Sequence, residues 1–154
     1  MKITDLLTIE RIQIDTDVGS KKRALEVLSE ILVAGDAPAS VIFSKLIGRE
    51  RLGSTGLGHG VALPHARIEQ SSEARGALIK LSQGIDFDAF DRQPVDLLFA
   101  LIVPAHFTDE HLQILASLAE LFSDQDLCRD LRQADSAEAI YRRLQAWQDA
   151  HGLT

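Results

Sequence analysis

The segment from Arg49 to His65 gathers residue types that suit the binding and transfer of an anionic group. Four of the ten glycines of the chain fall between positions 53 and 60. Glycine-rich backbone beside polar groups allows peptide N–H groups to approach an anion closely. An arginine, two hydroxyl residues and a histidine complete the pattern, which indicates phosphoryl chemistry. These four residues are Arg49, Ser54, Thr55 and His65.

His65 is the candidate nucleophile of this segment. A neutral imidazole is a good nucleophile, and its ordinary pKa of ~6.5 leaves it mostly neutral at pH 7. The N–P bond that it forms is labile, so a phosphohistidine can pass its phosphoryl group on. Such a relay needs donors for the phosphoryl oxygens, and Arg49, Ser54 and Thr55 are chemically suited to that role. A histidine that is merely satisfied in a turn is the alternative interpretation.

A second histidine, His111, falls in the first turn of a helix that we expect to begin after Thr108. The positive end of a helix disfavours an imidazolium and attracts phosphate. Alone, such a histidine is usually a surface residue. Paired with His65 across a crevice, it is a candidate orienter or charge stabiliser.

The familiar nucleotide-binding loops do not fit the glycine pattern. Gly53 and Gly58 have the spacing of a P-loop, but His59 and Gly60 stand where that loop needs a lysine and a hydroxyl residue. The dinucleotide-binding fingerprint Gly-x-Gly-x-x-Gly also fails. Val61 occupies the position of its third glycine, and a helix rather than a strand is expected before the glycines. The sequence therefore does not support either type of nucleotide-binding loop.

Hydrophobic periodicity predicts the elements that position these residues. The Ile-rich segment 10–15 predicts a strand, and residues 20–33 show helical spacing of leucines and isoleucines. A second helix is expected from near Asp36, with Pro38 in its first turn, to a point before Gly53. Strands are expected at 61–63, 76–81 and 95–103.

The run 95–103 is almost continuously apolar, which is typical of a strand buried on both faces. The last third of the chain is expected to be helical. We expect one helix to be capped by Thr108, a short one to begin with a capping box at Ser123, and a final one to begin with a capping box at Asp135. This order indicates a layered α/β domain with a mixed sheet, formed by residues 1–154 as one domain.

Composition excludes several classes of function. The chain has 16 Lys and Arg against 23 Asp and Glu, a net charge of −7, so nucleic acid is not an expected partner. The single cysteine, Cys128, cannot form an internal disulfide or a cysteine metal cluster. The longest apolar run is shorter than the ~20 residues that cross a bilayer, and the N-terminus lacks a signal-peptide pattern. We expect a cytoplasmic protein with no membrane insertion.

The glycine-rich segment resembles the phosphorylation-site signature of enzyme IIA proteins of the bacterial phosphotransferase system, in the fructose/mannitol class. The residues that carry this likeness are Gly53-Ser-Thr-Gly-Leu-Gly-His-Gly-Val-Ala-Leu-Pro-His65. Three other blocks are similar to the nitrogen-regulatory branch, EIIA-Ntr: Phe87-Asp-Ala-Phe-Asp-Arg-Gln-Pro-Val-Asp-Leu-Leu-Phe-Ala-Leu-Ile-Val-Pro104, Lys21-Lys-Arg-Ala-Leu-Glu26 and Leu127-Cys-Arg-Asp-Leu-Arg132. The resemblance covers residues from about 5 to 145.

This resemblance implies a role for each matching residue. His65 matches the histidine that is phosphorylated on Nε2, His111 matches the second active-site histidine, and Arg49 matches the arginine that supports the phosphoryl group. Ser54 and Thr55 match hydroxyls beside it. The implied fold is a central mixed β-sheet flanked by helices on both faces, and no cofactor is implied.

The resemblance also implies partners. The implied donor is a small histidine phosphocarrier of the HPr/NPr type. The regulatory branch has no dedicated sugar, and its phosphorylation state sets its binding to other proteins, including potassium-transport and sensor-kinase systems.

Two residues near the signature are open to more than one interpretation. His59 stands where the branch often has Asn, and is either a tolerated polar residue in a glycine turn or a third imidazole near the site. Arg67 often has a lysine counterpart, and could steer an acidic partner or phosphate or be a solvated charge.

Three other functions remain open from the sequence. A sugar-specific IIA component would pass the phosphoryl group to a IIB domain. A metalloprotein could use four of the histidines, although no carboxylate-supported ligand motif is present. A pure interaction module would explain the fold but not the grouping of arginine, hydroxyls, glycines and histidines. The four histidines of the metal alternative are His59, His65, His106 and His111.

Overall fold

The computed structural model describes residues 2–33 and 37–152 of the chain, and six of its strands form one sheet. The sheet has the order β1-β5-β6-β3-β2, and β4 pairs with β6 as well. The β5–β6 and β2–β3 pairs are antiparallel, whereas β1 pairs with β5, and β3 and β4 pair with β6, in parallel. The strands are β1 (Ile12–Thr16), β2 (Gly56–Gly58), β3 (Val61–Ala62), β4 (His65–Ile68), β5 (Arg75–Ile85) and β6 (Val95–Pro104).

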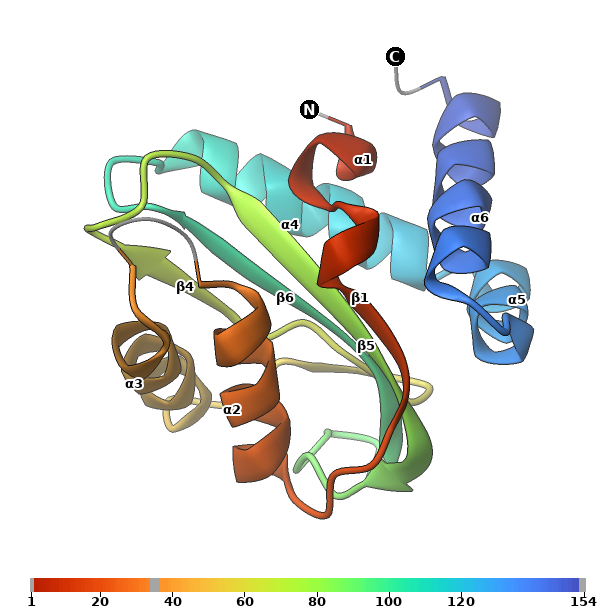
Figure 1. The fold of residues 1–154 in the computed structure, drawn as a ribbon, viewed down its shortest axis with the longest axis horizontal. Coiled ribbons are helices and arrows are strands. Elements are labelled where there is room, and N and C mark those ends of the chain that lie inside the picture. The colour runs from red at the N-terminus through yellow and green to blue at the C-terminus, as the bar shows by residue number, and fades with distance from the viewer. Residues whose placement is uncertain (1, 34–36, 153–154) are drawn as a thin grey trace.

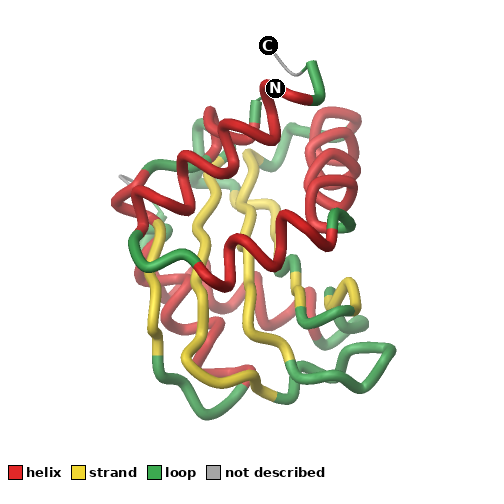
Figure 2. Tube along the Cα trace, turned by 90° about the vertical axis from the view of Figure 1, so that its right-hand side faces the viewer, coloured by secondary structure: helices red, strands yellow, loops and turns green. Residues whose placement is uncertain are grey.

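Helices cover both faces of this sheet (Figure 1). α2 and α3 pack on one face, where they share an apolar cluster with the sheet, and α1, α4, α5 and α6 share another cluster on the opposite face. The side view in Figure 2 shows the strands between these two groups of helices. The predicted fold class is therefore confirmed. The helices are α1 (Ile3–Leu6), α2 (Lys21–Ile31), α3 (Ala39–Glu50), α4 (Asp109–Phe122), α5 (Gln125–Gln133) and α6 (Ala137–Ala150), with a 3-10 turn η1 (Ile9–Arg11) before β1.

β6 is the central strand that the apolar run predicted. Leu98 and Ala100 belong to the apolar cluster under α2 and α3, while Leu97 and Phe99 belong to the cluster under α4 to α6. Successive side chains of a strand point to opposite faces, so an uninterrupted apolar run provides two buried faces at once.

Three predicted helix starts differ in detail from the structure. Thr108 is the N-cap residue of α4, but its side chain makes no capping hydrogen bond. The cap of α5 is Asp124 rather than Ser123, since the Asp124 carboxylate accepts from a backbone N–H of the first turn. The cap of α6 is Ser136 rather than Asp135, for the same reason. The predicted start of the second helix near Asp36 lies outside the described residues.

Two short strands that the sequence did not predict shape the region of the glycines. β2 forms an antiparallel hairpin with β3, and β4 begins at His65 and continues along the edge of β6. β3 and β4 thus pair with successive parts of the same strand, with Leu63 and Pro64 between them. Residues 9–11, expected to include the start of the first strand, form η1 instead.

No helix within residues 2–33 and 37–152 combines the length and the apolar character needed to cross a bilayer.

Candidate functional site

A hollow of about 610 Å³ opens at the β4 edge of the sheet, where α3 from one face and α4 from the other approach the same strand. The strand supplies His65 and Arg67, α3 supplies Arg49, and α4 supplies His111. Three of the five predicted site residues therefore lie in one hollow, although they are far apart in the sequence. The complete lining is Ser44, Lys45, Gly48, Arg49, Leu52, His65, Ala66, Arg67, His111, Leu112 and Leu115.

The hydrogen bond made by His65 determines which of its ring nitrogens can react. Nδ1 lies 2.8 Å from the carbonyl oxygen of Leu63. A carbonyl oxygen only accepts, so in the neutral ring Nδ1 carries the proton and the lone pair is on Nε2. Burial lowers the pKa of His65, the Leu63 carbonyl partly offsets this, and the positive charge of Arg49 lowers the pKa further. At pH 7 His65 is thus a neutral imidazole with a free Nε2.

His111 stands against His65 and is almost wholly buried, with 7% of its surface exposed. The two ring centroids are 5.5 Å apart and the rings meet edge to face. His111 Nδ1 accepts a hydrogen bond of 3.3 Å from Arg67 Nε, so its own proton is on Nε2. This Nε2 has no hydrogen-bond partner among the described residues. A buried donor without a partner is costly, and an oxygen of a group bound beside His65 could satisfy it.

Burial, followed by the charges of His65 and Arg67, lowers the pKa of His111 to about 4. His111 is the third residue of α4, in the first turn as predicted. The sequence indicated the same direction of the shift from the helix terminus, whereas in the structure burial is the largest cause. His111 is therefore neutral at pH 7 and acts as a hydrogen-bond donor rather than a cation.

The lining of the hollow is positively charged although the whole chain carries −7. Lys45, Arg49 and Arg67 contribute three cations, and no acidic residue is among the lining residues. Arg49 is in the last turn of α3, and its Nη1 donates to the carbonyl of Gly53 at 2.8 Å, which directs the guanidinium along the glycine-rich turn. A local cluster of cations beside a neutral nucleophile suits a dianionic phosphoryl group.

The hydroxyls of Ser54 and Thr55 are engaged outside the lining of this hollow. Ser54 Oγ donates to the carbonyl of Phe87 and accepts from Gly56 N, both at 3.0 Å. Thr55 is buried, and its Oγ1 donates to the carboxylate of Glu50. Direct contact of either hydroxyl with a phosphoryl group stays a prediction, while both side chains hold the turn after α3.

Sequence reasoning missed Glu50, whose side chain is only 2% exposed. Its carboxylate accepts from the backbone N–H of Thr55 and lies 2.9 Å from Lys21 Nζ. An acidic residue between two arginines at the end of a helix is normally solvated. Its burial depends on Lys21, 29 positions earlier in the chain, and the sequence contains no local signal of that pairing.

The other histidines do not join the site. His59 has a φ of 55° in the turn between β2 and β3, donates its backbone N–H to Asp91 and lines a different hollow. His106 is exposed and packs edge-on against Phe107. Within residues 2–33 and 37–152, no group of three or more His, Cys, Asp or Glu residues is placed to hold a metal ion. The metal alternative therefore has no ligand set in the described part of the chain.

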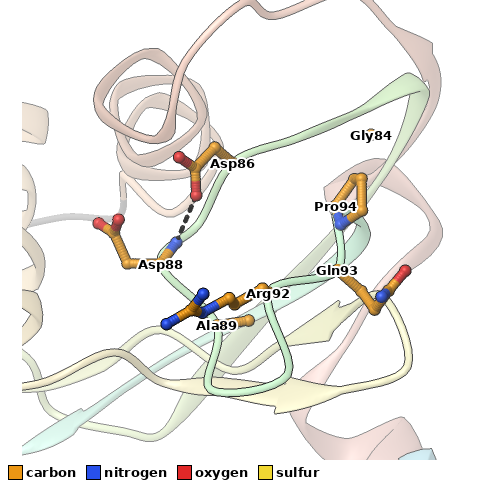
Figure 3. A pocket seen from close by; sticks show the side chains of 7 residues that line it. All are labelled: Gly84, Asp86, Asp88, Ala89, Arg92, Gln93 and Pro94. Atoms are coloured by element: carbon orange, nitrogen blue, oxygen red, sulfur yellow. Dashed lines mark hydrogen bonds between the residues drawn. The ribbon is translucent and has the colours of Figure 1, made fainter.

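A separate hollow lies in the connection between β5 and β6 (Figure 3). Asp86, Asp88 and Arg92 are among its lining residues, and an oxygen of Asp86 accepts from the backbone N–H of Asp88 at 2.9 Å. The lining contains no histidine, cysteine or hydroxyl side chain. This hollow therefore contributes no imidazole and is separate from the histidine site.

Comparison with known proteins identifies the family of the chain. Residues 5–147 match the family model described as "Phosphoenolpyruvate-dependent sugar phosphotransferase system, EIIA 2". The chain is 46% identical over 125 residues to the nitrogen regulatory protein of Escherichia coli K12, which covers 80% of this chain and 77% of that protein. It is 42% identical over 145 residues to the nitrogen regulatory protein of Pseudomonas aeruginosa, with 92% and 94% of the two chains covered.

A solved structure gives the same result in three dimensions. The crystal structure of the nitrogen regulatory protein IIA-Ntr from Neisseria meningitidis aligns with a TM-score of 0.88 at 40% identity, and covers 92% of this chain and 98% of that one. The family match spans most of the sequence, and these relatives share the nitrogen-regulatory description. The chain belongs to the EIIA type 2 family of the phosphotransferase system, in its nitrogen-regulatory branch.

Proposed function

We propose that the protein is a phosphohistidine relay with a regulatory output, in which His65 Nε2 accepts a phosphoryl group from a histidine phosphocarrier of the HPr/NPr type. One observation carries the proposal: the Leu63 carbonyl holds the proton of His65 on Nδ1, which leaves Nε2 as a neutral nucleophile in a hollow lined by cations. His111 supplies an unsatisfied N–H beside it.

The transfer requires no cofactor in this chain. The lone pair of His65 Nε2 forms a bond to phosphorus while the N–P bond of the donor breaks and its electron pair returns to the donor nitrogen. Positive charge develops on the His65 ring, and the Leu63 carbonyl stabilises the Nδ1–H that shares it. We expect Arg49 and Arg67, which line the hollow, to neutralise the phosphoryl oxygens, and we expect His111 Nε2–H to donate to one of them.

Two exposed leucines beside the hollow suit the docking of a protein donor. Leu52 is 84% exposed and Leu112 is 64% exposed, and both line the hollow, Leu52 just after α3 and Leu112 on α4. Exposed apolar side chains around a polar centre are typical of a protein contact. Phosphorylation then adds about −1.5 to −2 charge in the middle of that surface, which changes the partners that it attracts or repels.

The nitrogen-regulatory branch of the family supports a regulatory output. We propose that residues 1–154 act as one EIIA unit in the cytoplasm, that the phosphorylation state of His65 sets binding to regulatory targets such as potassium-transport or sensor-kinase proteins, and that nucleic acid is not a partner. In the alternative, a sugar-specific IIA component, the phosphoryl group passes to a IIB domain. Stoichiometric transfer of label to a IIB domain would support that alternative.

The test is phosphorylation in a reconstituted system. The protein is incubated with enzyme I, a phosphocarrier and labelled phosphoenolpyruvate, and the acid-labile label is counted. We expect one phosphoryl group per chain in the wild type and none in His65→Ala. His106→Gln, an exposed histidine outside the hollow, is the matched control and keeps full labelling. Stoichiometric labelling of His65→Ala would overturn the proposal.

A further inference from the structure

Glu50 is a buried carboxylate that the proposed transfer step does not use. It accepts from Thr55 twice, through the backbone N–H at 3.3 Å and through the hydroxyl Oγ1. Its charge is balanced by Lys21 Nζ at 2.9 Å, an ammonium that is itself only 18% exposed. A buried carboxylate with so complete a set of partners fixes the backbone that donates to it.

The fixed backbone leads directly to the nucleophile. The carbonyl of Thr55 accepts from Leu63 N at 3.0 Å, and the carbonyl of Leu63 accepts from His65 Nδ1 at 2.8 Å. A continuous hydrogen-bonded path therefore connects Glu50 with His65 through Thr55 and Leu63. On the other side, the carbonyl of the intervening proline accepts from Leu101 N of β6 at 2.9 Å, so the short segment before His65 is held from both directions.

Lys21 attaches the same network to a third part of the fold. Its ammonium also donates to the carbonyl of Phe87 at 3.3 Å and lies 4.5 Å from the centre of that aromatic ring. Ser54 Oγ donates to the same Phe87 carbonyl. Lys21 thus connects the start of α2 with Glu50 at the end of α3 and with the loop that follows β5.

We propose that Glu50 is a positioning residue for His65: through Thr55 and Leu63 it places the carbonyl that keeps the proton on Nδ1, and so it keeps Nε2 free to accept a phosphoryl group. The kinetic part of this proposal rests on the proposed function, whereas the tautomer of His65 does not. In this arrangement Thr55 acts on the phosphoryl group through the backbone rather than by direct contact.

Two roles of Glu50 can be distinguished by experiment: stabilisation of the turn alone, and positioning of His65. Loss of stability alone would affect the whole molecule and leave the ring of His65 in the same tautomer. Loss of positioning releases the Leu63 carbonyl, so that part of the His65 population carries its proton on Nε2. In these molecules Nε2 has no lone pair available to accept a phosphoryl group. The tautomer of His65 is therefore the decisive readout, and the phosphorylation rate is the second.

The experiment uses the whole chain with ¹⁵N-labelled histidine at pH 7.5, and compares Glu50→Gln, Thr55→Val and Thr55→Ser with the wild type. Two-bond ¹H–¹⁵N correlations report which ring nitrogen of His65 carries the proton. Thr55→Val removes only the hydroxyl and leaves the buried ion pair in place, so it serves even where Glu50→Gln reduces folding. Asp124→Asn is the matched control, because Asp124 likewise accepts from a backbone N–H and from a side chain, Trp147 Nε1. Asp124 lies beyond the C-terminal end of α4, which runs for about 16 Å after His111.

We expect Nδ1–H in the wild type, in Asp124→Asn and in Thr55→Ser, and a mixture of tautomers in Glu50→Gln and Thr55→Val. We expect the rate of phosphoryl transfer to fall about five- to tenfold in the last two variants, the factor that one neutral hydrogen bond contributes. An unchanged tautomer in both variants overturns the positioning role, whatever the rate does. If the wild type takes up no label while the tautomer depends on Glu50, the proposed function fails and the positioning role stands.

Discussion

Lowering the pH from 7 to 5 should destabilise this protein through His111. Its folded-state pKa of about 4 lies below the ordinary value of ~6.5 that the unfolded chain has. The unfolded state therefore binds a proton first as the pH falls, so the stabilisation is complete above pH 6.5 and is lost between pH 6.5 and 4. Linkage gives a loss of about 2 kcal/mol between pH 7 and pH 5 from this residue alone. Such a loss is a large part of the 5–15 kcal/mol that is typical of a domain.

The measurement is urea unfolding of the wild type and of His111→Gln at both pH values. The variant keeps a polar side chain of similar length but does not titrate. Its free energy of unfolding should fall by about 2 kcal/mol less than that of the wild type over this range. His65, whose pKa is also lowered, contributes in the same direction in both proteins, so the difference reports the titration of His111 together with its coupling to His65. Equal pH dependence in the two proteins would refute the lowered pKa, and so would an NMR titration of His111 with a midpoint near 6.5.

Three further perturbations follow from contacts in the structure. Lys21→Met leaves the Glu50 carboxylate buried without its cation and should cost about 3 kcal/mol of unfolding free energy. The double variant with Glu50→Gln should regain most of this, because it removes the charge and keeps an oxygen that accepts from Thr55; a change below about 0.5 kcal/mol in the urea midpoint analysis of Lys21→Met would contradict the account. We expect Leu52→Ser and Leu112→Ser to leave the free energy of unfolding within about 0.5 kcal/mol of the wild type, because both leucines are exposed. Each should raise the KM for the phosphocarrier about tenfold. Unchanged KM values in the labelling assay would exclude this docking surface. Gly76→Ala should destabilise the β5–β6 pair by about 1–3 kcal/mol, because an aromatic ring of the facing strand lies 2.5 Å from the position of the added methyl group; a melting temperature equal to that of the wild type would contradict the close contact.

The elements that the sequence predicted are those whose pattern is local and long. α2 and α3 have an apolar stripe over several turns, and the run 95–103 has apolar residues on both faces, so each pattern has one structural interpretation. β2 and β4 are three and four residues long, and they exist because they pair with strands that are distant in the chain. A pairing of that kind leaves little periodicity in the short segment itself, which is why both strands were missed.

The helix caps show a second limit of sequence reasoning. At positions 123–124 and 135–136, two residues that are able to cap a helix stand side by side. Only the backbone conformation decides which side chain reaches the N–H groups of the first turn, and in both cases it is the second residue. The first helical residue was therefore predicted to within one or two positions, whereas the capping contact was not.

The candidate reacting groups of the site were easier to find from the sequence than the residues that surround them. The sequence analysis chose His65, His111 and Arg49 because their side chains suit phosphoryl chemistry. The structure places all three around one hollow. Glu50 has an ordinary side chain for a helix end, and only the fold brings Lys21 to it. Thr55 was chosen for its hydroxyl, and in the structure that hydroxyl is bonded to Glu50 outside the hollow.

The most direct test of a relay at this site is to identify the atom that receives the phosphoryl group. The protein is phosphorylated through enzyme I and a phosphocarrier, and ¹H–¹⁵N and ³¹P spectra of the histidine-labelled chain are recorded under alkaline conditions that preserve the N–P bond. A hydrogen bond from His65 Nδ1 to the Leu63 carbonyl predicts a single phosphoryl group on His65 Nε2. A phosphoryl group on Nδ1 of His65, or on any other residue of the chain, would contradict it.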